Sequence, residues 1–149
     1  PTDIAELIEK TIRTAPDVNN ISVSVDNRLA DPVADVDPDQ MIQVLTNLYT
    51  NAQQAMPEGG DLTITLTDDP ETITIMVEDT GVGVPPEHMP KIFDPFFTTK
   101  QVGMGTGLGL AVSHGIVKMH KGQISAESNT EMSKGPTGTT FTITLPRHE

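Results

Sequence analysis

Two consecutive runs of alternating apolar and polar residues constrain the fold of this chain more than any other feature. The first run has apolar residues at positions 62, 64 and 66, and the second at positions 73, 75 and 77. Successive side chains of a strand point to opposite faces, so each run predicts a strand with one buried face. The segment between the runs, residues 68–70, reads Asp-Asp-Pro and favours a turn. We therefore predict a β-hairpin over this region.

Three segments have apolar residues at helical spacing, and further strands are expected between them. The helical segments are residues 3–13, 37–56 and 107–119. In the second, Asp37 is a candidate N-cap and Pro38 suits the first helical position. The additional strands are expected at residues 21–25, 33–36, 122–127 and 138–145. Because several strands follow one another without a helix between them, the sequence predicts an α/β (α+β) two-layer sandwich. Its mixed, mainly antiparallel sheet would be covered by three helices on one face.

Composition limits the partners and the compartment of the chain. Its 149 residues suit one domain, residues 1–149, and a formal charge of −12 with only nine Lys and Arg argues against nucleic-acid binding. The chain has no cysteine and no apolar run near the ~18 residues that cross a bilayer. We expect a cytoplasmic domain without membrane contact. Because it begins at Pro1, we expect a fragment of a longer protein, and membrane anchoring of that parent stays open.

A long loop is expected at residues 80–107, which contain nine Gly or Pro. Loops of this length in compact domains are usually functional or disordered. Three of the four phenylalanines, Phe93, Phe96 and Phe97, lie in this segment. Their clustering predicts that the loop docks either on the chain's own core or on a partner helix and brings Lys100 with it. A small satellite core with a solvated lysine is the alternative.

Glycines at positions 103, 105, 107 and 109 alternate immediately before and into the third helix. Free backbone N–H groups at a helix N-terminus favour phosphate. The pattern matches neither the Walker motif nor the Gly-x-Gly-x-x-Gly dinucleotide fingerprint. A flexible loop at the start of a helix explains these glycines equally well.

Asn47, Asn51 and Gln54 form one stripe on the second helix, at positions i, i+4 and i+7. This stripe borders the apolar face of the helix. An asparagine carbonyl there can complete the coordination of a Mg²⁺ ion whose other ligands are phosphate oxygens and water. The alternative is a polar helix flank with no ligand.

Asp79 shares the buried parity of residues 73, 75 and 77. A buried carboxylate is costly without a donor, and an adenine amine is one such donor. Gly81 and Gly83 would let the backbone approach a flat ring. Thr139 has the inward parity of its own strand and points toward the same layer. The alternatives are that Asp79 caps a turn and that Thr139 is an ordinary buried threonine.

In order and spacing, these motifs resemble the ATPase domain of sensor histidine kinases, in the group that includes gyrase, the Hsp90 chaperones and MutL. The resemblance rests on four boxes: QVLTNLYTNAQQA (43–55, N box), EDTGVGVP (78–85, first glycine box), IFDPFFTTK (92–100, F box) and GMGTGLGL (103–110, second glycine box). The closing GTTFTITLP is similar to the family's last strand, and the F box favours histidine kinases over the other relatives. The resemblance implies a Bergerat-type fold with an ATP lid at about residues 80–107.

The resemblance also implies the phosphate side of a nucleotide site. Asn51 would coordinate Mg²⁺, with Asn47 and Gln54 beside the phosphates. The lid over the phosphates would consist of Lys100, Gly103, Gly105, Thr106, Gly107, Leu108 and Gly109.

On the base side, the resemblance implies that Asp79 binds the adenine amine, helped by Thr139 through water. Gly81 and Gly83 would line the base pocket.

The activity implied by the resemblance is transfer of the γ-phosphoryl group of ATP to a histidine. That histidine would lie on a dimeric helical hairpin of the same parent protein, from which a response regulator takes the phosphoryl group. We assign no catalytic residue, because Gln43 stands where some relatives have an acidic residue. A nucleotide-binding regulatory module without transfer stays open. A related protein-serine kinase is disfavoured by the F box.

Overall fold

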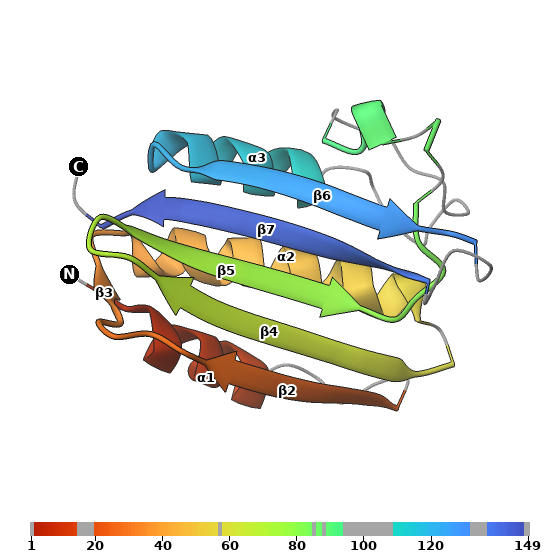
Figure 1. Cartoon of the computed structure of the whole chain (residues 1–149), viewed down its shortest axis with the longest axis horizontal. Helices are drawn as coiled ribbons and strands as arrows, with labels where there is room; N and C mark the ends of the chain where they lie inside the picture. Colours follow the sequence, from red (N-terminus) through yellow and green to blue (C-terminus); the bar gives the residue numbers. More distant parts are fainter. Residues whose placement is uncertain are drawn as a thin grey trace.

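The main sheet is built around the predicted hairpin. The computed structural model describes residues 2–14, 20–56, 58–84, 86–87, 89–93, 109–131 and 137–147. Strands β4 (Gly60–Asp68) and β5 (Thr72–Asp79) are antiparallel; β7 (Gly138–Pro146) pairs with β5, and β6 (Gln123–Asn129) pairs with β7, both antiparallel. β2 (Ile21–Asn27) lies parallel to β4. The strand order is β2-β4-β5-β7-β6 (Figure 1), and the sheet is mixed and mainly antiparallel, as predicted.

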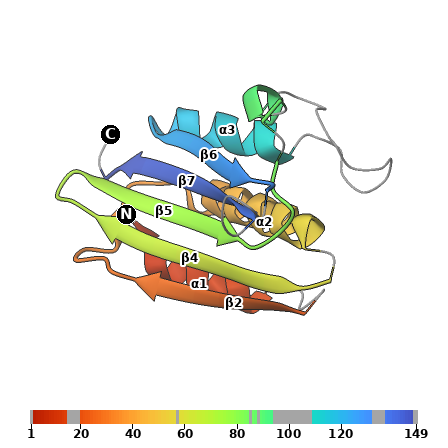
Figure 2. The ribbon, with the colours of Figure 1, turned by 45° about the vertical axis from the view of Figure 1, so that its right-hand side comes forward.

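Three α-helices cover one face of this sheet. They are α1 (Ile4–Thr14), α2 (Pro38–Ala55) and α3 (Gly109–Met119), and Figures 1 and 2 show them on the same side. The parallel pairing of β2 with β4 needs a crossover connection, which α2 provides. The predicted two-layer sandwich is confirmed. In the described part of the chain, no helix has the length and hydropathy needed to span a bilayer.

A two-stranded ribbon lies beside the main sheet and was not predicted as such. It pairs β1 (Thr2–Asp3) with β3 (Val33–Ala34) in antiparallel register. The sequence predicted a strand at residues 33–36, which is longer, and no strand before the first helix. Two-residue strands are too short to show a period, so alternation cannot reveal them.

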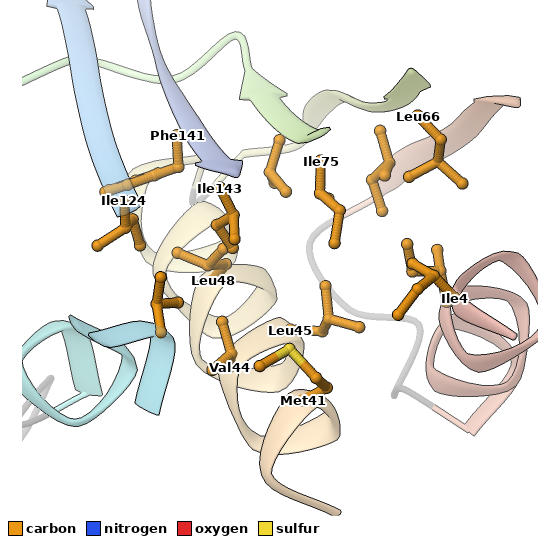
Figure 3. Close-up of a cluster of buried hydrophobic side chains, with 14 of the residues drawn as sticks. Ile4, Met41, Val44, Leu45, Leu48, Leu66, Ile75, Ile124, Phe141 and Ile143 are labelled. Atoms are coloured by element: carbon orange, nitrogen blue, oxygen red, sulfur yellow. The ribbon is translucent and has the colours of Figure 1, made fainter. Parts of the chain in front are cut away.

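The core fills the space between the sheet and the helices (Figure 3). Inward residues of the strands, such as Ile75, Ile143 and Leu66, meet Met41 and Leu48 of α2, and all five are at most 2% exposed. Burying an aliphatic side chain of this size contributes about 1.5–3 kcal/mol relative to exposure. The alternation that predicted the strands is therefore the pattern that builds this core.

The start of α2 is held by its predicted cap and by a histidine at the end of α3. The Asp37 carboxylate accepts hydrogen bonds from the backbone N–H groups of Asp39 (3.0 Å) and Gln40 (3.1 Å). The Asp37 N–H donates to Nε2 of buried His120 at 3.0 Å, and Nδ1 of that ring lies 2.8 Å from the Ile116 carbonyl. Because Nε2 accepts from Asp37, Nδ1 is the ring nitrogen that donates to the Ile116 carbonyl. His120 thereby joins the two helices that flank the later site.

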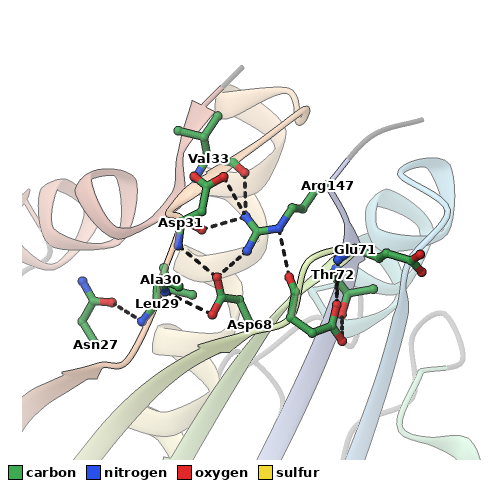
Figure 4. Close-up of polar contacts among 10 residues, drawn as sticks. Asn27, Leu29, Ala30, Asp31, Val33, Asp68, Glu71, Thr72 and Arg147 are labelled. Atoms are coloured by element: carbon green, nitrogen blue, oxygen red, sulfur yellow. Dashed lines mark hydrogen bonds and ion pairs between the residues drawn. The ribbon is translucent and has the colours of Figure 1, made fainter.

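Arg147, which follows β7, collects several chain segments at one end of the sheet (Figure 4). Its guanidinium donates to the carbonyls of Asp31 (2.7 Å), Val33 (3.0 Å) and Asp69 (3.1 Å) and to the Asp68 carboxylate. The residue is only 4% exposed. Arg147 therefore ties β7 to the β4–β5 turn and to the segment that leads into β3.

Asp68 is the acidic partner in this cluster, and its side chain is 7% exposed. Its carboxylate accepts the backbone N–H groups of Asp31 (3.0 Å) and Ala30 (3.1 Å) besides the Arg147 guanidinium. The pKa of Asp68 is held below its usual value by these hydrogen bonds, first by those from Asp31 and Ala30 and then by that from Arg147. Burial acts in the opposite direction.

Candidate nucleotide-binding site

Asp79 ends β5 at the opposite end of the sheet, where its side chain is buried with 4% exposure. Its Oδ1 accepts the backbone N–H groups of Gly81 at 2.9 Å and of Thr139 at 3.2 Å. Among the described residues, both of these donors reach Oδ1, and no donor to Oδ2 is found. The strand parity that predicted a buried carboxylate is confirmed. The structure adds that one oxygen is held by backbone and the other is left to accept from elsewhere.

The pKa of Asp79 reflects a buried carboxylate with hydrogen-bond donors on only one of its two oxygens. Burial raises the pKa of the Asp79 carboxyl, the N–H groups of Gly81 and Thr139 lower it, and the charge of Glu78 raises it, with a net upward shift. A buried carboxylate that lacks a full set of donors favours a donor-bearing ligand, because desolvation penalises its charged form. A base amine is a donor of this kind.

The loop after Asp79 is held by backbone contacts on both sides. The Val82 N–H donates to the Ala55 carbonyl at the end of α2, at 3.2 Å. A Cβ on Gly81 would lie 2.6 Å from that same carbonyl oxygen, and one on Gly83, where φ is 81°, would lie 2.4 Å from the Asn129 carbonyl oxygen. Both positions therefore require glycine, and the loop passes tightly between α2 and β6.

Thr139 lies beside Asp79 at the start of β7 and is 3% exposed. Its Oγ1 lies 3.0 Å from Oγ of Ser128, its register partner on β6. Ser128 Oγ also accepts the Val84 N–H at 2.6 Å and lies 3.0 Å from the Gly138 carbonyl. The structure therefore brings the predicted Asp79, Gly81, Gly83 and Thr139 together around one corner of the sheet.

Asn47, Asn51 and Gln54 lie on the flank of α2, and all three are half-buried, as the helical period predicted. Asn47 Nδ2 donates to Oγ of Ser113 on α3 at 3.3 Å, and Ser113 is fully buried. This contact holds the Asn47 amide between two helices.

The phenylalanine-rich segment docks on the chain's own core where it is described. Ile92 is buried, and the ring of Phe93 lies 5.3 Å from the ring of His114 on α3 and 6.4 Å from that of Phe141 on β7, between ring centroids. Of the two alternatives, a core contact or a partner helix, the contacts of Phe93 support the first. Gly109 begins α3. The other lid residues lie outside the described residues: Lys100, Gly103, Gly105, Thr106, Gly107 and Leu108.

Ser113 and Ser128 contact predicted site residues, but sequence reasoning did not identify them. Ser128 has the inward parity of Ile124 and Ala126 on β6, so its polar side chain among inward positions was a readable signal. Ser113 lies in the helical pattern of α3 and gives no comparable signal, because a small serine is common at helix contacts.

The fold and the buried aspartate together define a class: a two-layer sandwich with a buried carboxylate and a tight glycine loop at the end of its central strands. Comparison with known proteins agrees with this class. Residues 36–149 match the family described as Histidine kinase-, DNA gyrase B-, and HSP90-like ATPase, and the chain belongs to this family. The resemblance found in the four boxes is thereby confirmed.

Individual relatives are named as sensor kinases. Sensor kinase CckA of Brucella abortus (strain 2308) is 45% identical, over 72% of this chain and 12% of its own length. Sensor histidine kinase ZraS of Escherichia coli (strain K12) is 43% identical, over 77% of this chain and 23% of its own length. The chain thus spans less than a quarter of either relative.

A solved catalytic domain of histidine kinase ThkA, in a nucleotide-free form, superposes with a TM-score of 0.80 and 30% identity. The match covers 99% of this chain and 96% of that one. The chain therefore has the fold of a histidine-kinase catalytic domain.

Proposed function

We propose that this chain binds Mg-ATP and donates its γ-phosphoryl group to a histidine on a separate dimerisation and phosphoacceptor domain in two-component signalling. The observation that carries the proposal is the Asp79 carboxylate, buried and held by backbone on one oxygen only. The similarity to relatives named as sensor kinases also supports the proposal. A response regulator is the downstream partner, and the domain works in the cytoplasm, where ATP is available.

On the base side, Asp79 accepts the exocyclic amine of adenine through Oδ2. Thr139 assists through a bridging water, and Gly81 and Gly83 line the pocket. The tight fit of both glycines against α2 and β6 supports this assignment, because a preformed loop loses little freedom when a base binds.

On the phosphate side, Asn51 holds Mg²⁺ with its side-chain oxygen, and Asn47 and Gln54 lie beside the phosphates. The donor chemistry fits, since Mg²⁺ prefers oxygen ligands and usually keeps several waters and phosphate oxygens. The ion would neutralise the phosphates, which matters for a chain of charge −12. The chain is a single domain of residues 1–149, with a lid at about residues 80–107. The residues that cover the phosphates are Lys100, Gly103, Gly105, Thr106, Gly107, Leu108 and Gly109.

The acceptor histidine lies on another domain in this proposal. Of the histidines that the structure describes, His120 uses both ring nitrogens inside the fold, and the His114 ring packs against Phe93 with the ring planes tilted by 33°. Neither arrangement suits an in-line attack on a phosphoryl group. Positioning and charge stabilisation dominate phosphoryl transfer, so the nucleotide domain needs no nucleophile of its own.

Calorimetric titration of ATP with Mg²⁺ and with excess chelator tests the nucleotide part. We expect Mg²⁺ to strengthen binding, and Asn51→Ala to remove most of that gain. Thr50→Ala, an exposed neighbour on the same helix, is the matched control and should behave as wild type. Equal affinity with and without the ion refutes the metal role of Asn51.

Radiolabelled ATP tests the transfer part. The chain alone should acquire no acid-labile label, and adding a phosphoacceptor hairpin of the parent protein should give label on that hairpin. Label on this chain alone refutes the separate acceptor. Nucleotide binding with no label on the hairpin favours the regulatory module instead, and an acid-stable label on a partner serine favours a serine kinase.

A further inference from the structure

We propose that Ser128 is a positioning residue that makes the Thr139 hydroxyl a hydrogen-bond acceptor and so sharpens the preference of the site for an amine-bearing base. This inference rests on the proposed function, because it concerns the specificity of the same pocket. It goes beyond Asp79, since it assigns the direction of a second polar group beside that carboxylate.

The argument starts from the hydrogen-bond capacity of a serine hydroxyl, which has one proton to donate and two lone pairs to accept. Three groups lie within hydrogen-bond distance of Ser128 Oγ: the Val84 N–H at 2.6 Å, the Gly138 carbonyl at 3.0 Å and Thr139 Oγ1 at 3.0 Å. The N–H can only donate, and the carbonyl can only accept. Two of the three contacts are therefore assigned without choice.

Those two assignments decide the third. The Ser128 proton goes to the Gly138 carbonyl, and the Val84 N–H occupies one lone pair of Ser128. The contact with Thr139 then forms only if Thr139 donates its proton to the remaining lone pair of Ser128. All three contacts are satisfied together in this arrangement alone. The Thr139 oxygen consequently keeps lone pairs but no proton for other partners.

The acceptor role of the Thr139 hydroxyl matters because Thr139 lies beside Asp79. The backbone N–H of Thr139 donates to Asp79 Oδ1 at 3.2 Å, so Thr139 and Asp79 are neighbours at this corner of the sheet. Two acceptors at one corner suit a group with two protons to donate, directly or through a bridging water. The exocyclic amine of adenine is such a group, whereas the carbonyl of hypoxanthine or guanine at the same ring position is not.

Removing the Ser128 hydroxyl frees the Thr139 proton. In Ser128→Ala, the Thr139 hydroxyl can rotate and donate to a base carbonyl. We expect the preference for ATP over ITP to fall by roughly three- to tenfold, the scale of one hydrogen bond. ITP is the chosen probe because it differs from ATP by a carbonyl in place of the amine and by the linked protonation of the ring.

Competitive binding of ATP and ITP to wild type, Ser128→Ala, Thr139→Val and the double variant tests the proposal. Ser125→Ala is the matched control, because Ser125 lies on the exposed side of the same strand, and its preference should equal that of wild type. The Ser128→Ala effect should vanish in the Thr139→Val background, where there is no hydroxyl to redirect. A purely structural role of Ser128 would instead weaken both nucleotides equally.

Two results overturn the inference: an unchanged ATP preference in folded Ser128→Ala, or the same loss of preference when Thr139 is already valine. If circular dichroism shows that Ser128→Ala is unfolded, Ser128→Cys replaces it, since a thiol keeps the size but hydrogen-bonds weakly. Failure of the wild-type chain to bind ATP at all would refute the proposed function instead.

Discussion

The two ends of the β4–β5 hairpin each bury an aspartate, and the two carboxylates are treated in opposite ways. Asp68, at the turn, receives two backbone N–H groups and the Arg147 guanidinium, and its pKa is lowered. Asp79, at the far end of the hairpin, receives two backbone N–H groups on one oxygen, and burial raises its pKa. The contacts of the first end stabilise the fold, whereas the second end keeps a buried carboxylate with donors on one oxygen only, which costs stability.

The largest expected effect is on the Asp68 end. Arg147→Met should destabilise the fold by about 3 kcal/mol, because the Asp68 carboxylate loses its cationic partner and three backbone carbonyls lose a donor. Urea unfolding followed by circular dichroism measures it. Arg28→Met is the control: Arg28 pairs with Asp26 on the surface, with 68% of its side chain exposed, and its loss should hardly move the midpoint. Equal midpoints for both variants would mean that Arg147 is no more than a surface charge.

The next effect is on ligand binding at the Asp79 end. Asp79→Asn should weaken ATP by about ten- to a hundredfold, or 1.5–3 kcal/mol, because a charge-assisted hydrogen bond to the amine is lost. Calorimetry with ATP, GTP and adenosine measures it.

Lys100→Ala provides the contrast for that measurement. In the proposed lid, Lys100 contacts only phosphate, so its loss should weaken ATP more than adenosine, whereas Asp79→Asn should weaken both. If folded Asp79→Asn keeps the wild-type preference for ATP over GTP, Asp79 does not recognise adenine.

The contribution of Asp68 to the stability of the fold should decrease as the pH falls. The folded-state pKa of Asp68 is lowered, so its contribution is present above the unfolded pKa and is lost as pH falls through the folded pKa. Asp68→Asn should therefore be less stable than wild type at pH 7, and the difference should shrink on acidification. The loss should be smaller than for Arg147→Met, because the amide oxygen can still accept from backbone. A pH-independent difference would exclude the charge as its cause.

The smallest effect has the opposite sign. Because burial raises the folded-state pKa of Asp79, its ionised form opposes folding at pH 7, and that penalty disappears as pH falls through the folded pKa. Asp79→Asn should thus be more stable than wild type by about 0.5–2 kcal/mol at pH 7, in the absence of nucleotide, with a shrinking advantage in acid. Thermal unfolding of the two proteins at several pH values tests this. A variant less stable than wild type at pH 7 would show that the Asp79 end is not a strained site.

Much of the fold was predictable because it rests on local periods. Alternation located the main strands, and apolar spacing located all three helices, with Asp37 correctly assigned as the N-cap of α2. The same parity gave the buried positions of Asp79 and Thr139. The sequence predicted a strand over β3, though a longer one, but it did not predict β1 or their pairing, because β1 is only two residues long.

Contacts between residues far apart in the chain were harder to predict from the sequence. His120 meets Asp37 across 83 positions, and Asn47 meets Ser113 across 66. The sequence around His120 and around Ser113 contains no pattern that identifies these distant partners. The docking of Phe93 stayed undecided between core and partner for the same reason, until its ring was found beside those of His114 and Phe141.

By itself, the sequence determined which residues face the core and which motifs could hold a nucleotide, because side-chain parity and helical period are properties of the local backbone. Only the tertiary structure decided that Asp79 keeps one oxygen without a described donor, that Ser128 lies against Thr139, and that Arg147 meets Asp68. A hydrogen bond needs two groups within about 3 Å of each other in a suitable direction. The packing of distant segments sets that distance, and no local pattern encodes it.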